Sequence, residues 1–411
     1  MPECTDNLDL NQTFGARVRR VRERNGQTRP VVGGLVGRSA EWVKGIETGR
    51  LGVPRLPLLL RLAEVLGVDD LAELTGDERL TKSSYSKAAH PALPAVKDAL
   101  TSYRFTTADA DPEDVDDLRA RVQEAWQLWH GLGKHRTRIA SLLPSLLVDL
   151  QHAARHLEGV DRRRALVSLA ETYHLAQLYL AFQPAPELVM LTGDRAMTAA
   201  QDADSPRAIA SAAWYMNHVF RDAGERHEAR VDLAMKAADL LRPDETGEDL
   251  ARWGLLQLAA ALSFAKVGKK GDSQRFWDRA DDAARRLGDS YAHPYLIFGR
   301  GMVDAYAITM AADLVQGRAA VSAAEAVDVD GMPSATRRSF HMIESARAYS
   351  MQGEKVAVVH LLKKAHEVSP ETARYNLFTR SAVADLAETG PATIRSDARV
   401  LRQELGLSAA A

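Results

Sequence analysis

The stretch Arg29–Thr48 reads RPVVGGLVGRSAEWVKGIET and predicts two short helices joined by a tight turn. Gly33 and Gly37 stand four residues apart, where two crossing helices need a small residue and where the turn needs a glycine. Ser39 is suited to cap the second helix, although Trp42 stands where a capping box would have Glu or Gln. This order of elements is that of a helix-turn-helix that reads DNA.

Three further short helices are expected around this motif. Phe14–Arg24 follows Thr13, a residue suited to an N-cap, and has apolar residues at i, i+4 and i+7 on one face. Leu58–Leu66 follows two prolines, and a short helix is expected after Asp70. Together the five helices predict a compact all-α domain over residues 13–76 with one small core of leucine and valine.

The charge of the chain is unevenly distributed. The 411 residues have a net charge of −2, which by itself argues against a protein that binds nucleic acid. Between Thr13 and Arg61, however, eleven Lys and Arg stand against three acids, a balance of +8, so the remainder must carry about −10. A basic module joined to a mildly acidic body is expected where only that module touches phosphate.

The order of features in this module resembles a known family. A basic first helix is followed by the turn glycine Gly37, by Ser39 and Val43, by Ile46-Glu47-x-Gly49, and then by a proline and a leucine-rich helix. This order resembles the Cro/C1 (xenobiotic-response-element) class of DNA-binding domains, and the run GRSAEWVKGIETGR is similar to its actinobacterial members. The resemblance implies a five-helix, lambda-repressor-like head.

Two positions depart from that family pattern. Arg29 stands where such domains usually carry a Gln that contacts phosphate, a role that a guanidinium can also serve. Gly45 stands where relatives have a long side chain, and a glycine within a helix costs about 1 kcal/mol relative to alanine. The recognition helix is therefore expected to be weak or bent.

The expected DNA contacts fall into two groups, because phosphate contacts set affinity while base edges set sequence preference. In the major groove, Lys44 could contact guanine, Glu41 a cytosine amino group and Ala40 a thymine methyl. The phosphate contacts are assigned to Arg29, Arg50 and one or more of Arg17, Arg19 and Arg20. The residues expected to lie at or in the major groove are Arg38, Ser39, Ala40, Glu41 and Lys44.

Beyond the basic module, residues 77–112 are expected to form a linker with a short helix at Ala95–Tyr103, and residues 113–408 a helical body. The clearest helix pair spans Ala208–Pro243, with Gly224 at its turn, and resembles a tetratricopeptide (TPR) unit. Looser copies occupy Asp249–Leu287 and Thr336–Pro370. Stacked pairs of this kind predict a TPR-like right-handed α-solenoid, which also resembles the long C-terminal half of actinobacterial regulators.

The aromatic residues of the body allow two interpretations. Most are expected to pack between helices, while some could line a concave groove that receives a peptide or a partner helix. The groove candidates are Trp214, Asn217, His218, Arg221, Trp253 and Phe298.

Asp109–Asp117 holds six acids in nine residues. One interpretation is an acidic helix start, with Asp111 as N-cap and Pro112 in the first turn. The alternative is a strip that docks on the basic head and competes with DNA.

Other motifs give little indication of chemistry. His152 and His156 have the spacing of a helical zinc pair, but no third ligand is evident. Asp328-x-Asp330-Gly331 resembles only the start of a calcium loop. Cys4 is the single cysteine, and no apolar run approaches the ~20 residues that span a bilayer. A non-enzymatic protein without cofactor or metal is expected, in the cytoplasm and associated with the nucleoid.

The sequence therefore predicts a transcriptional regulator whose head binds a double-stranded DNA operator. The body would sense a peptide, a small molecule or a protein partner and mediate formation of a homodimer, since one small head offers limited contact area. The alternative is an interaction scaffold or adaptor whose head keeps the fold without reading DNA.

Overall fold

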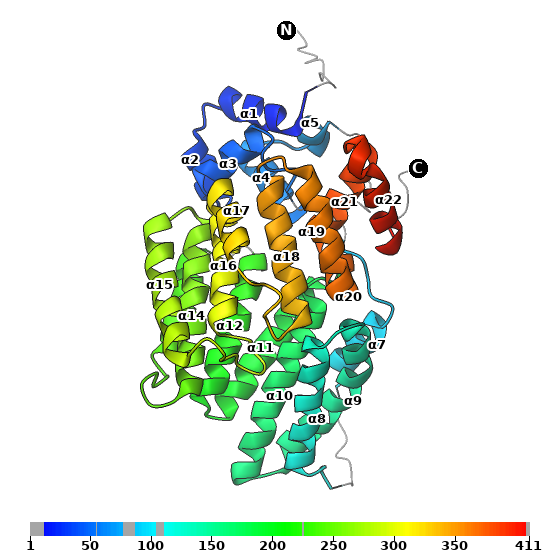
Figure 1. The fold of residues 1–411 in the computed structure, drawn as a ribbon. Helices are drawn as coiled ribbons and strands as arrows, with labels where there is room; N and C mark the ends of the chain where they lie inside the picture. Colours follow the sequence, from blue (N-terminus) through cyan, green and yellow to red (C-terminus); the bar gives the residue numbers. More distant parts are fainter. Residues whose placement is uncertain (1–11, 55, 77–86, 104–110, 224–225, 408–411) are drawn as a thin grey trace.

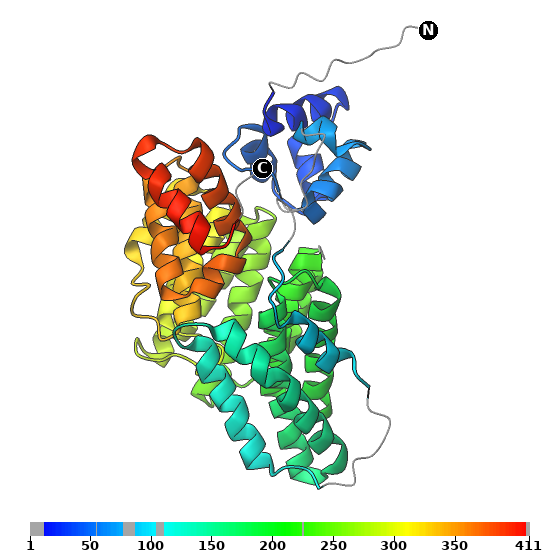
Figure 2. The same ribbon diagram turned by 90° about the vertical axis from the view of Figure 1, so that its right-hand side faces the viewer.

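The computed structural model describes residues 12–54, 56–76, 87–103, 111–223 and 226–407. Within these ranges every regular element is a helix, which confirms the all-α prediction. The N-terminal helices form a small head, residues 13–76, that sits on one end of a long helical body (Figure 1; Figure 2). The short helix expected at Ala95–Tyr103 in the linker is Leu93–Thr101, and because it packs against α9 (His135–His156) it belongs to the body, residues 93–404.

The head contains the five expected helices around one core. Their bounds are α1 (Phe14–Arg24), α2 (Arg29–Leu35), α3 (Ala40–Glu47), α4 (Leu56–Leu66) and α5 (Leu71–Thr75). The core is formed mainly by valines and leucines that are fully or almost fully buried, among them Val18, Val21, Val32, Val43, Ile46, Leu59, Leu62, Leu66 and Leu74.

Three helices of the head begin at the caps that the sequence predicts. The Thr13 hydroxyl accepts a hydrogen bond from the backbone N–H of Ala16 at 3.3 Å. Ser39 accepts from the N–H of Trp42 at 3.0 Å, and Asp70 caps α5. Since these bonds satisfy donors that the first turn of a helix leaves free, they fix where each helix starts.

The body consists of helices that pack side by side along the chain. They are α7 (Leu93–Thr101), α8 (Val115–His130), α9 (His135–His156), α10 (Gly159–Leu180), α11 (Pro186–Asp202), α12 (Pro206–Ala223), α13 (His227–Ala238), α14 (Gly247–Lys266), α15 (Lys270–Leu287), α16 (Arg300–Asp313), α17 (Gly317–Ala326), α18 (Ala335–Ser350), α19 (Lys355–Val368), α20 (Pro370–Tyr375), α21 (Leu377–Thr389) and α22 (Ala392–Glu404). A helical solenoid is compatible with this arrangement.

Two of the predicted helix pairs turn at a glycine with a left-handed backbone. Gly268 connects α14 to α15 with φ +78°, and Gly353 connects α18 to α19 with the same φ. Residues with a Cβ rarely adopt this conformation, so glycine is favoured at both turns. The predicted turn at Gly224 lies outside the described residues.

A buried carboxylate joins the late helix α20 to the start of α9. Glu371 accepts hydrogen bonds from the N–H of Arg136 at 2.6 Å and from the N–H and hydroxyl of Thr137 at 3.3 and 2.5 Å. Lys134, the residue before α9, provides no side-chain cap. Glu371 caps the helix instead, although it lies 235 positions after Arg136 in the sequence. Burial alone would raise the pKa of Glu371, but the donors His90 and Thr137 lower it to about 2.

Glu371→Gln is expected to lower the free energy of unfolding at pH 7 by about 3 kcal/mol, the value of a pKa held about two units below that of an ordinary carboxylate. A lowered pKa stabilises the fold above the ordinary pKa near 4.3, and this stabilisation is lost as the pH falls toward 2. Urea unfolding across this range should therefore show the variant and the wild type converging in acid. Glu367→Gln, at an exposed position of α19, is the control and should change little.

The acidic segment before α8 starts a helix, but at a different N-cap from the one predicted. Asp114, not Asp111, is the N-cap, and its carboxylate accepts from the N–H groups of Asp116 and Asp117 at 2.8 and 3.4 Å. The start of α8 lies at the end of the body farthest from the head (Figure 1; Figure 2). The idea that residues 111–117 dock on the head is therefore wrong for this conformation, and Asp109 lies outside the described residues.

Candidate nucleic-acid interface

The crossing of α2 and α3 depends on two glycines, as predicted. A Cβ added at Gly33 would lie 2.9 Å from the carbonyl oxygens of Arg38 and Ser39, so only glycine allows the two helices to approach this closely. Gly37 has φ +68° and lets the chain reverse between the helices. Gly15 gives α1 the same close approach to the backbone at the end of α3.

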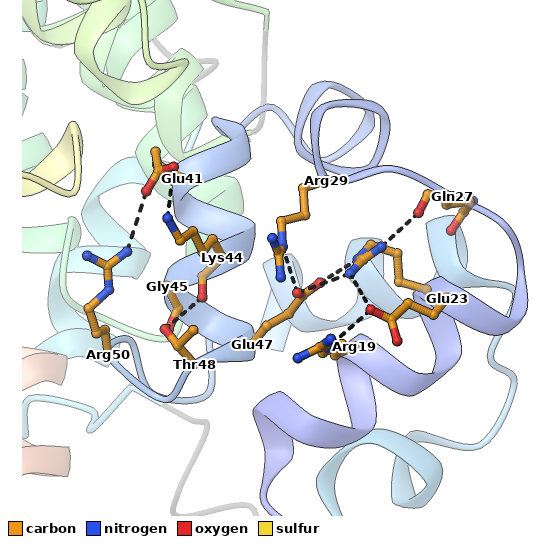
Figure 3. Close-up of polar contacts among 11 residues, drawn as sticks. Arg19, Glu23, Gln27, Arg29, Glu41, Lys44, Gly45, Glu47, Thr48 and Arg50 are labelled. Atoms are coloured by element: carbon orange, nitrogen blue, oxygen red, sulfur yellow. Dashed lines mark hydrogen bonds and ion pairs between the residues drawn. The ribbon is translucent and has the colours of Figure 1, made fainter.

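A buried acid, Glu47, holds the three helices together, a role that its place in the family pattern did not indicate. The Glu47 side chain is 1% exposed, and its two oxygens lie 2.5 Å from Arg22 Nε and 2.8 Å from Arg29 Nε (Figure 3). Arg22 also donates to the Gln27 carbonyl at 2.9 Å. Charged groups that are buried in this way need partners, and here α1, α2 and α3 each supply one member of the cluster.

This cluster changes the assignment of the basic residues. Arg29, assigned to phosphate from the sequence, is bonded to Glu47 and is about one-third exposed (34%). The assignment of Arg17 to phosphate is wrong for this structure, because its side chain is buried inside the head against Gly76. Arg19 is exposed and pairs with Glu23 at 2.8 Å, and Arg20 is half-buried.

Three charged side chains form an exposed strip on α3 and just after it. Lys44 Nζ lies 3.6 Å from one Glu41 oxygen, and Arg50 Nη2 lies 3.5 Å from the other (Figure 3). All three side chains are between 39% and 55% exposed. The strip holds two cations and one anion: a lysine can contact guanine and a glutamate the cytosine amino group in a major groove, and an arginine can contact the phosphate backbone. We call Glu41, Lys44 and Arg50 the reading strip.

The other residues of the head that are predicted to contact DNA lie at the start of α3. The hydroxyl of Ser39 serves as the N-cap, and Ala40 is half-buried in the first turn. Arg38 is half-buried as well and donates from Nη1 to the Gly37 carbonyl at 2.8 Å. The structure thus brings Arg38, Ser39, Ala40 and the reading strip together around α3.

Three of the residues proposed to line a groove in the body are buried and cannot line one. Trp214 and Phe298 are 0% exposed and belong to the main core. Asn217 is buried and donates to the Arg230 carbonyl at 2.8 Å. These three residues pack inside the body, which corrects the groove hypothesis for them.

The other three residues proposed for the groove are less deeply buried. The ring of His218 lies edge-on to the Trp214 ring with the centroids 4.6 Å apart. Trp253 packs half-buried against the same core, and Arg221 is half-buried.

The histidine pair on α9 is held by its own helix. The two rings are 4.1 Å apart, and His156 Nδ1 lies 2.9 Å from the His152 carbonyl oxygen. In the part of the chain that the structure describes, no three His, Cys, Asp or Glu residues gather where they could hold a metal ion. The helices in the same ranges include none that is both long and apolar enough to span a membrane.

Comparisons with known proteins support the identity of the head. Residues 13–74 match a family described as a helix-turn-helix domain, and this range spans α1 to α5. The crystal structure of BtubC (BKLC) from P. vanneervenii is similar at 13% identity and a TM-score of 0.37, over 57% of this chain and 91% of that one. Comparison with curated proteins gives no match. The head is a helix-turn-helix domain, which suggests a DNA-binding regulator.

Proposed function

We propose that the protein is a sequence-specific transcriptional regulator of the Cro/C1 type, and not an enzyme. The single observation that carries this proposal is the exposed reading strip on and just after α3, the second helix of the helix-turn-helix motif in the matched domain. In such domains the second helix enters the major groove and its N-terminal residues contact base edges. Lys44 then donates to guanine, Glu41 accepts from a cytosine amino group, and Arg50 contacts phosphate.

The body supplies regulation in this proposal. It senses a peptide, a small molecule or a protein partner and joins two chains into a homodimer, so that two heads bind the two halves of an operator in the cytoplasm. The uneven charge supports this division of labour, because the basic residues are concentrated in the head while the rest of the chain is acidic.

A shift assay across a range of salt concentrations tests DNA binding directly. Because each phosphate contact releases counterions, the affinity for duplex DNA should fall steeply with salt, and a preferred sequence should emerge by selection from a random pool. No binding at low salt would instead support the adaptor hypothesis.

Lys44→Ala is expected to cost about 1–3 kcal/mol on the preferred site and to relax the sequence preference there. The lysine is about half exposed, so its loss should leave the fold of the head intact. Lys236→Ala, at an exposed ion-paired lysine of α13, is the matched control and should change neither affinity nor preference. Equal losses on preferred and random DNA would show that Lys44 contacts phosphate instead.

A further inference from the structure

The recognition helix α3 does not face open solvent on all of its outer side, because its start touches the body. A Cβ added at Gly268, in the turn between α14 and α15, would lie only 2.5 Å from Ser39 Cβ. This distance means that the backbone of the turn lies directly against the N-cap of α3. In Figure 1 the head accordingly rests on the upper end of the body, with α3 beside α17.

A second contact continues this one along α3. Trp42 and Leu51 pack into the core of the head and also against an apolar cluster at the upper ends of α16, α17 and α18. Gly45 completes the contact, since a Cβ there would lie 3.5 Å from Val315 Cγ1 and 2.9 Å from Leu51 Cδ1. We call the part of the body that meets α3 the platform: it consists of Gly268, of Val315, and of the apolar cluster to which Val315 belongs.

The residues of α3 that touch the platform lie next to the reading strip. Ser39, Trp42 and Gly45 follow one another at intervals of three, so they form one line along the helix, directly beside Glu41 and Lys44. Figure 3 shows Glu41, Lys44 and Arg50 on the side of α3 that faces the ribbons of the body. The platform therefore occupies the space from which DNA would approach.

DNA cannot be seated on α3 in this arrangement. A major groove about 12 Å wide admits a helix only when both sides of its reading face are free to enter between the two phosphate backbones. With the platform against Ser39, Trp42 and Gly45, one phosphate backbone would have to pass through the body. The charges of the reading strip are thus exposed to solvent, with the body directly beside them along α3.

We infer that the platform is an intramolecular docking surface for the recognition helix and competes with DNA for it. The closed arrangement is the inactive state, and DNA binding requires the head to move off the platform. This inference rests on the proposed DNA-binding function of the head. It also gives Gly45 a role, because a side chain at this position would displace Leu51 and crowd Val315.

One test separates the head from the platform by a substitution in the body. Gly268→Asn keeps a residue type that tolerates a left-handed backbone and places a side chain against Ser39. Gly353→Asn is the matched control, since Gly353 has the same φ of +78° in an equivalent turn but open space around it. The first variant should bind a random-sequence duplex pool at low salt about tenfold more tightly than wild type, and the control should not.

A second test locks the closed state. Ser39→Cys and Gly268→Cys, combined with Cys4→Ser, place two thiols where a shift of about 1 Å gives the ~3.8 Å Cβ–Cβ separation of a disulfide. The oxidised protein should not bind the same duplex pool, and reduction of the same sample should restore binding to at least the level of the Ser39→Cys single variant, since the free side chain at position 268 also pushes against the head. Electrophoresis without reductant measures how completely the disulfide forms.

The outcomes distinguish the inference from the proposed function. Failure of the disulfide to form, together with no gain of DNA affinity in Gly268→Asn over Gly353→Asn, would show that α3 does not dock on the platform. Complete cross-linking with equal DNA binding in both redox states would overturn the inference and leave the proposed function standing. Complete cross-linking with no DNA binding by any form, wild type included, would refute the proposed function and the inference together.

Discussion

Glu47→Ala is expected to lower the free energy of unfolding of the head by about 3–5 kcal/mol, which is the usual cost of removing one partner from a buried ion cluster. The carboxylate is 1% exposed and is bonded to both Arg22 and Arg29. Without it, the buried Arg22 retains the Gln27 carbonyl but loses its principal anionic partner. Hydrogen exchange of the α1–α3 amides would report this loss separately from the stability of the body.

Glu23→Ala is the matched control for this prediction. Glu23 also pairs with Arg19 and Arg22, but its side chain is half exposed, and such pairs contribute about 0–1 kcal/mol. Equal effects of the two substitutions would contradict the view that burial decides the role of Glu47. Because Glu47 fixes the end of α3 against α1 and α2, its loss should also weaken DNA binding without touching the reading strip.

Asp313→Ala is expected to have a comparable effect in the body, a loss of about 3–5 kcal/mol. Its carboxylate is 2% exposed and lies 2.6 Å from Lys266 Nζ and 2.6 Å from Arg347 Nη2. Burial alone would raise the pKa of Asp313, but these two cations hold it well below its usual range. Burial already lowers the pKa of Lys266 to about 7 even beside Asp313, so without this carboxylate the buried lysine is expected to lose its proton at pH 7, while Arg347 keeps its charge without its partner at Asp313.

Urea unfolding at pH 7 measures this loss, with Asp397→Ala as the control. Asp397 pairs with Lys363 at 3.2 Å, but it is about half exposed and should contribute less than about 1 kcal/mol. Because the pKa of Asp313 is lowered, its contribution is present above the ordinary carboxylate pKa near 3.9 and is lost as the pH falls below it. A loss at pH 7 no larger than that of the control would show that Lys266 and Arg347 find other partners.

The local features of the head could be predicted from the sequence because they depend on neighbouring residues. Thr13, Ser39 and Asp70 cap helices through bonds that span two or three residues, and Gly37 is required by the backbone of a single turn. The roles of the arginines could not be predicted in the same way. All arginines of α1 look alike in sequence, and only the packing of α1 on α3 and α5 buries Arg17 and leaves Arg19 exposed.

In the body, the prediction failed where several residues satisfied the same local rule. Asp111 and Asp114 are both good N-caps, and the helix begins after the second because Val115 is the first residue that the core buries. Trp214 and Phe298 suited a groove and a core equally well until their neighbours were known. The contact of α3 with the platform involves glycines and small side chains far apart in the chain, which leave no periodic signal.

The bond between Glu371 and the start of α9 changes how the body is expected to hold together. An array of repeats in which each unit touches only its neighbours behaves almost one-dimensionally, so it can fray from either end. Here a carboxylate on the late helix α20 caps the start of the early helix α9, 235 positions away in the sequence. Loss of α20 would leave the first turn of α9 without this acceptor, so these two helices are expected to unfold together although they lie far apart in the sequence.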